Sequence, residues 1–153
     1  MNINEASDFL KGLISETNKK TEIKIYTDFI VVLSALKNRE LTEEELESIE
    51  KKLNNLKLKA HPEKKKNYFR QQLSEFETYL KKEFSLITEG YYTALGIAIG
   101  PGFGMVLGMI VLNFLERSLG MTYGMIGGMV LGYFIGRNLD AKAEKENRVL
   151  KTK

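Results

Sequence analysis

Residues 91–115, YYTALGIAIGPGFGMVLGMIVLNFL, and residues 118–136, SLGMTYGMIGGMVLGYFIG, decide the fold of this 153-residue chain. Twelve of its 13 glycines fall between Gly90 and Gly136, but only two of its 43 charged residues, Glu116 and Arg117, do so. As helices at 1.5 Å per residue, the two stretches would be about 38 Å and 28 Å long, against a hydrocarbon core of about 30 Å. We therefore predict two transmembrane spans, joined by a short turn at Glu116 and Arg117, in a hairpin at residues 90–137.

Nine of these glycines stand four residues apart, in two unbroken series. The series are Gly96, Gly100, Gly104 and Gly108 in the first span, and Gly120, Gly124, Gly128, Gly132 and Gly136 in the second. Positions four apart share one helix face, so each span carries a groove that another backbone can approach closely enough for dispersion and Cα–H contacts. These contacts matter in lipid because the hydrophobic effect does not drive helices together there. The spacing therefore predicts helix packing.

The two spans also repeat each other. The pentapeptide Gly104-Met-Val-Leu-Gly108 recurs as Gly128-Met-Val-Leu-Gly132, and Leu95-Gly96 aligns with Leu119-Gly120, always at an offset of 24. The spans therefore resemble duplicated units. A methionine follows many of these glycines, and we interpret this stripe as adaptable packing rather than a copper site, because no histidine or cysteine lies near it.

Pro101 interrupts the first span between two glycines. Proline removes a backbone hydrogen bond and predicts a kink in the helix. We favour a tolerated kink that fits the crossing of the two helices, and the alternative is a hinge or the mouth of a pore.

Charges that flank the spans predict their orientation. Basic residues precede the first span and follow the second, whereas the turn holds one arginine paired with a glutamate. The flanking anchors are Lys81, Lys82, Arg137, Lys142 and Lys145. By the positive-inside rule both termini lie in the cytoplasm, with Tyr91, Tyr92, Tyr133 and Phe134 as an aromatic belt at that interface. The first residues lack a secretory signal pattern, so we expect a multi-pass protein of the bacterial inner membrane with a basic cytosolic tail at residues 138–153.

Residues 1–89 predict a cytosolic helical region. Apolar residues recur at helical spacing from Ala6 to about Lys19, with Ser7 or Asn4 as the cap, and again over Thr21–Asn38. Thr42 and Glu45 have the spacing of a capping box. Two heptad-like seams follow. They run from Leu46 to the His61-Pro62 pair and from Phe69 to Ile87. The seams suggest an antiparallel helical hairpin with coiled-coil spacing, completed by the shorter helices or by neighbouring copies.

The composition argues against several classes of site. Without cysteine there is no disulfide scaffold, thiolate metal site or cysteine nucleophile, and His61 is the single histidine. We interpret His61 as a turn residue. We expect no enzyme activity, no cofactor and no metal. The net charge of +3 comes from the tail, so we also expect no nucleic-acid partner.

The glycine series and the Gly136-Arg-Asn-Leu-Asp tail resemble those of glycine-zipper membrane proteins, in particular uncharacterised bacterial ones with a cytosolic helical region before a two-span hairpin. The resemblance covers about residues 89–150 and implies architecture rather than activity. Two hypotheses follow. In the first, the chain is an all-α membrane protein that self-associates in the lipid bilayer as a homo-oligomer through its glycine-zipper helices. Its cytosolic helical domain then serves as an anchor, a scaffold or a binding module for an unidentified cytosolic protein. In the second, several hairpins surround a pore or permeabilise the membrane, although neither span carries the polar stripe expected of a channel.

Overall fold

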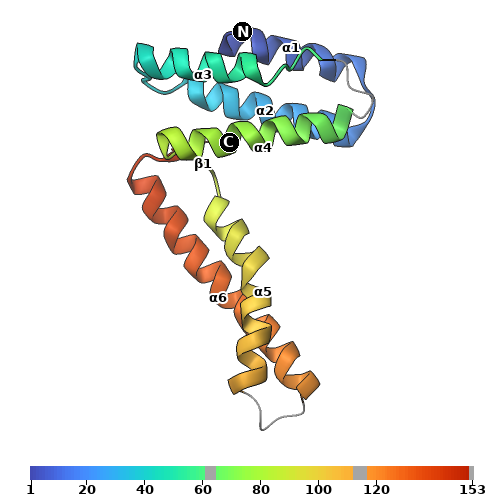
Figure 1. Ribbon diagram of the computed structural model, residues 1–153, viewed down its shortest axis with the longest axis vertical. Helices are drawn as coiled ribbons and strands as arrows, with labels where there is room; N and C mark the ends of the chain where they lie inside the picture. The colour runs from blue at the N-terminus through green and yellow to red at the C-terminus, as the bar shows by residue number, and fades with distance from the viewer. Residues whose placement is uncertain (61–64, 112–116, 152–153) are drawn as a thin grey trace. The chain divides into compact units, whose positions relative to one another are not determined.

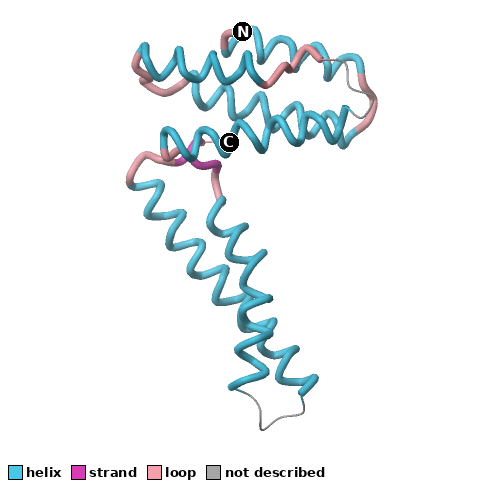
Figure 2. Tube along the Cα trace, in the orientation of Figure 1, coloured by secondary structure: helices cyan, strands magenta, loops and turns pink. Residues whose placement is uncertain are grey.

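The computed structural model describes residues 1–60, 65–111 and 117–151. Within these ranges the chain is all-α, as predicted, and divides into two compact units, one formed by residues 1–88 and 150–151 and one formed by residues 89–149. Figure 1 labels the helices, and Figure 2 shows how little of the chain is strand. The first unit holds α1 (Ile3–Glu16), α2 (Lys20–Lys37), α3 (Glu43–Asn55) and α4 (Lys65–Phe84). The second holds α5 (Tyr91–Val111) and α6 (Arg117–Lys145).

Side-chain caps set the starts of two helices in the first unit. The Thr42 hydroxyl accepts a hydrogen bond from the Glu45 backbone N–H, and the Glu45 carboxylate accepts one from the Thr42 backbone N–H, which confirms the predicted capping box. The same arrangement at Asn2 and Glu5 starts α1. The predicted cap at Ser7 or Asn4 was therefore wrong. Asn2 caps instead because its side chain satisfies an amide that would otherwise have no partner.

The core of the first unit is built around four aromatic rings. Tyr26 packs edge-on to Phe69 with ring centroids 5.0 Å apart, and Phe29 lies 5.6 Å from Phe76. All four are at most 1% exposed, and aliphatic residues of all four helices surround them, including Leu10 of α1 and Leu53 of α3. Burial of this apolar surface is the main stabilising contribution to the unit.

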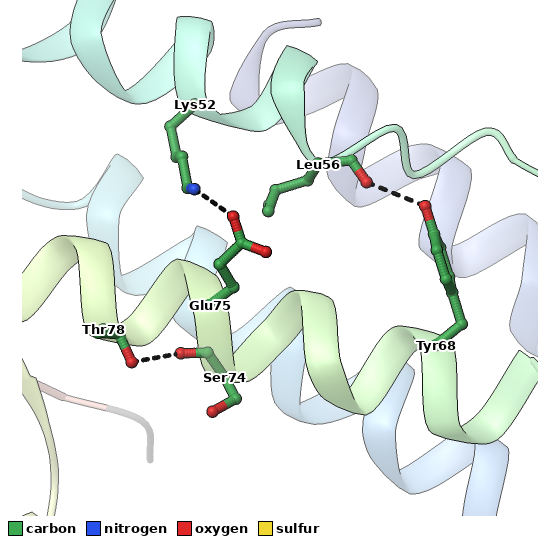
Figure 3. Close-up of polar contacts among 6 residues, drawn as sticks. All are labelled: Lys52, Leu56, Tyr68, Ser74, Glu75 and Thr78. Carbon is green, nitrogen blue, oxygen red and sulfur yellow. Dashed lines mark hydrogen bonds and ion pairs between the residues drawn. The ribbon is translucent and has the colours of Figure 1, made fainter.

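Polar contacts fix the direction of α3 against α4. Ser48 hydrogen-bonds to Tyr79 at 2.6 Å, and one helical turn later Lys52 forms an ion pair with Glu75. The Tyr68 hydroxyl donates to the backbone carbonyl of Leu56 at 3.1 Å (Figure 3). Because residue numbers rise along α3 while those of their partners fall along α4, the two helices are antiparallel, as predicted.

The ends of α3 and α4 differ from the predicted ones. The helix α3 ends at Asn55, because Lys57 adopts a left-handed conformation with φ of 49° that a helix does not continue through. The predicted end at His61-Pro62 lies outside the described residues. Likewise α4 ends at Phe84, where Ser85 has φ of 56°, so Ile87 belongs not to a helical seam but to strand β1 (Ile87–Thr88), which pairs with β2 (Val149–Leu150).

Candidate functional site

Two long apolar helices form the second unit and are the candidate membrane hairpin. At 1.5 Å per residue, the 21 residues of α5 extend about 32 Å and the 29 of α6 about 44 Å, so either is long enough to cross the hydrocarbon core. The helix α5 begins at Tyr91, as predicted. Residues 112–115 of the predicted first span, and Glu116 of the predicted turn, lie outside the described residues. The second helix runs past Gly136 to Lys145, so the predicted cytosolic tail begins as helix.

The two glycine series face each other inside this hairpin. A Cβ atom built on Gly96 would lie 2.0 Å from the carbonyl oxygen of Gly132, and one built on Gly100 would lie 2.3 Å from that of Gly128. A Cβ atom built on Gly104 would lie 2.1 Å from the carbonyl oxygen of Gly124, and one built on Gly108 would lie 2.3 Å from that of Gly120. Real Cβ atoms essentially never come within 3.0 Å of such atoms. The backbones therefore touch along four successive turns, at a separation that only glycine permits.

Gly136, the last member of the second series, meets a different partner. Its Cβ position lies 2.3 Å from the carbonyl oxygen of Tyr92 and 2.6 Å from the Cα of Thr93. The close approach thus continues to the first turn of α5, where the partner is no longer glycine. By contrast, Gly102 and Gly127 lie outside the two series and have nothing within 4 Å of their Cβ positions, so they are open on the outer surface of the hairpin.

Asp140 ties the start of α5 to α6, a role that none of the sequence patterns predicted. Its carboxylate accepts hydrogen bonds from the backbone N–H groups of Tyr92 and Thr93, each at 2.9 Å, and from the Thr93 hydroxyl at 2.6 Å. A carboxylate at a helix N-terminus satisfies free amides and interacts favourably with the helix dipole. One signal was available. Glu89 and Gly90, which precede α5, provide no short polar cap, so another residue had to supply one.

The remaining predicted site residues are distributed as follows. Pro101 lies within α5, which continues through it. Lys81 and Lys82 lie in the last turn of α4 and belong to the first unit, whereas Arg137, Lys142 and Lys145 lie along α6. All five basic residues are exposed. Two aromatic pairs accompany them: Tyr91 with Tyr92, and Tyr133 with Phe134, each in edge-on contact.

The first unit offers a second candidate surface, a pocket of about 510 Å³ between α2 and α4. Charged side chains of both signs line it: Lys24, Asp28, Arg70 and Glu77. Burial, and secondarily the nearby Asp28 carboxylate, raise the pKa of Glu77 above its ordinary value. Among the described residues no group of three or more His, Cys, Asp and Glu side chains is placed to hold a metal ion.

Glu22, a buried acid of the first unit, has a structural role that its contacts explain. Glu22 accepts a hydrogen bond from the Thr17 hydroxyl at 2.9 Å and pairs with Lys19 at 3.3 Å. The Thr17 bond, followed by the Lys19 contacts, outweighs the effect of burial and holds the pKa of Glu22 below its ordinary value. Glu22 is therefore a structural carboxylate at the start of α2.

Comparison with known proteins finds no relative from which a function can be carried over. No family model matches the chain, and neither do any curated protein or any solved structure. Functional inference therefore rests on the two units themselves.

Proposed function

We propose that this protein is an integral membrane protein in which the α5–α6 hairpin anchors a cytosolic helical module to the bacterial inner membrane. In this proposal the hairpin is of the glycine-zipper kind, self-associates in the bilayer, and leaves both termini in the cytoplasm. The module of α1–α4 then acts as a scaffold or as a binding surface for an unidentified cytosolic protein.

The observation that carries this proposal is the exposure of the apolar side chains on α5 and α6. Only 11% of the most apolar 18-residue stretch of each helix is buried, whereas a core helix of a soluble protein is mostly buried. Phe103, Ile110 and Leu131 are 70%, 67% and 64% exposed. An apolar surface of this size is costly in water and suited to lipid. The glycines pack the inner faces of α5 and α6 against each other, so lipid would cover the outer surface of the hairpin.

The pore hypothesis receives less support from the same helices. The helices approach each other through glycine backbone, which leaves no lumen within the hairpin along the four paired turns. The large groove on the hairpin is lined by apolar residues and glycine, and these offer a permeating ion little in place of its hydration shell. We therefore propose the anchor and scaffold role.

Fractionation of the full-length protein tests the anchor. The protein should stay with membranes after an alkaline carbonate wash. Val106 and Val130 are half exposed near the middle of the two helices, and an aspartate at each should weaken insertion, because a charge at the bilayer centre costs about 3 kcal/mol. A matched control is Leu46→Asp on the exposed face of α3, which should leave attachment unchanged. Release of the wild-type protein by the wash would contradict the anchor.

A further inference from the structure

The hairpin has an internal two-fold relation that the sequence repeat and the glycine contacts share. The operation adds 24 to a position in α5 and subtracts 24 from its partner in α6. It turns the contact of Gly100 with Gly128 into the contact of Gly124 with Gly104, and the structure has both contacts. Gly104 and Gly128 exchange places under this operation. A Cβ atom added to either one would lie 2.7 Å from the Cα of the other. The axis therefore passes through the middle of the hairpin.

Symmetry is broken strongly on one face. An apolar groove of about 620 Å³ runs along the seam between the helices, and both Phe103 and Gly127 line it. These two positions are related by the offset of 24, yet one carries a large ring and the other no side chain. Among the described residues no large apolar side chain is more exposed than Phe103, at 70%, and nothing lies within 4 Å of the Gly127 Cβ position. The same face thus presents a knob and a hole.

Knob and hole stand at the same height along the hairpin. Gly104 contacts both Gly124 and Gly128, so it is level with Ile126, midway between them. The helices are antiparallel, so Phe103, one residue earlier on α5, is level with Gly127, one residue later on α6. Two copies of equal orientation, related by a two-fold axis along the membrane normal and placed groove to groove, oppose α5 of one copy to α6 of the other. Phe103 of each copy then meets Gly127 of the other.

We propose that a second copy of this chain occupies the groove, with Phe103 of each hairpin inserted at Gly127 of its partner. The proposal rests on the membrane anchor proposed above. The size of the surface fits a stable dimer. Five large side chains from Leu95 to Val111 on α5, with Leu131, Ile135 and Leu139 on α6, are each 40–70% exposed. At roughly 100 Å² each they offer about 800 Å², the area that each partner contributes to a standard interface.

Shape decides the partner, because lipid is as apolar as the groove. Helix association in a bilayer depends on close packing, and small residues mark the positions where it occurs. In the proposed dimer the ring fills the hole, and the glycine series stays engaged within each hairpin. The isologous arrangement closes the assembly at two copies, since each hairpin uses the same face.

A swap of knob and hole tests the dimer. The full-length protein in density-matched detergent should sediment at twice its chain mass of 17.5 kDa. Phe103→Gly leaves two holes and Gly127→Phe creates two opposed knobs, so each should raise the dimer dissociation constant about tenfold or more. The double variant Phe103→Gly with Gly127→Phe exchanges the two roles, and the two-fold relation predicts that it dimerises like wild type. Phe134→Gly and Gly102→Phe are matched controls, because both residues are exposed on the hairpin but lie outside this groove.

Three results would overturn the dimer. One is a monomeric wild-type protein that still resists carbonate extraction, which leaves the anchor intact. Another is a dimer that neither single variant weakens. The third is a double variant as weak as the singles, with far-UV circular dichroism confirming its helix content. A wild-type protein released by the wash would instead contradict the anchor on which the dimer rests.

Discussion

Gly104→Ala gives the sharpest test of the packing inside the hairpin. The added Cβ would lie 2.1 Å from the Gly124 carbonyl oxygen and 2.7 Å from the Gly128 Cα, where ordinary contact begins at 3.4 Å. All the opposing atoms are backbone, so no flexible side chain can move away. One helix must therefore shift by about 1.3 Å, and a gap of that size forfeits more than about half of the dispersion energy of the contacts that it opens.

The expected cost follows from this displacement. Overpacking by one methyl group typically costs about 1–3 kcal/mol, and the replacement of a helical glycine by alanine returns about 0.5–1 kcal/mol. We expect a net loss of about 1–2 kcal/mol, or a 5–30-fold shift toward separated helices. Gly102→Ala, two residues earlier on the same helix, meets nothing within 4 Å and should be neutral or slightly stabilising. The same glycine-to-alanine change on α5 should therefore destabilise the hairpin at Gly104 but not at Gly102.

Pyrene labels supply the assay. The chain has no cysteine, so cysteines introduced at the exposed residues Ile97 and Tyr133 are the only labelling sites. Each directly follows one of two glycines that face each other, Gly96 and Gly132, and the two positions are level because Gly132 meets both Gly96 and Gly100. Excimer emission then follows the separation of the helices during an SDS titration. A midpoint for Gly104→Ala equal to that for Gly102→Ala would refute the close backbone packing.

Further predictions concern single polar groups. Asp140→Ala should weaken the labelled hairpin by about 1–2 kcal/mol, and Asp140→Asn by less, because Asn keeps one acceptor oxygen. An equal loss from Asn138→Ala, on the same helix, would argue against the cap. Thermal unfolding of the full chain should find Glu22→Gln less stable than wild type at pH 7 but not at pH 3. The pKa of Glu22 is lower in the folded than in the unfolded chain, so its carboxylate stabilises the fold above the unfolded pKa, and this stabilisation is lost as the pH falls. Glu77→Gln should show the opposite sign, a gain at pH 7 that disappears in acid, because its folded pKa is raised. Tyr68→Phe should cost about 1 kcal/mol by leaving the carbonyls at the end of α3 without their donor, and unchanged unfolding would show that water replaces it.

Local signals predicted the helices well, and non-local ones explain what was missed. The box at Thr42 and Glu45 involves neighbours in sequence, so spacing alone defined it. The left-handed residues at Lys57 and Ser85 carry no glycine or asparagine signal, so the ends of α3 and α4 could not be placed. Asp140 acts across 48 residues on Tyr92, and such a contact needs the hairpin geometry.

The glycine series illustrate the same limit. Four-residue spacing predicted a face without side chains, but a bare face accepts any backbone, whether from the same chain or from another. Only the structure places Gly100 against Gly128 and leaves Gly127 open. Hence the sequence predicted which residues pack but not which helix they pack against, and it gave no reason to single out Phe103.

Cysteine accessibility in oriented membrane vesicles tests the central claim, that α5 and α6 cross a bilayer with both termini in the cytoplasm. Because the chain has no cysteine, Lys82→Cys before α5 and Arg117→Cys in the predicted turn, at the start of α6, each provide one labelling site. An impermeant maleimide should label Lys82→Cys only in inside-out vesicles and Arg117→Cys only in right-side-out vesicles. Labelling of both positions from the same side would contradict the spanning hairpin.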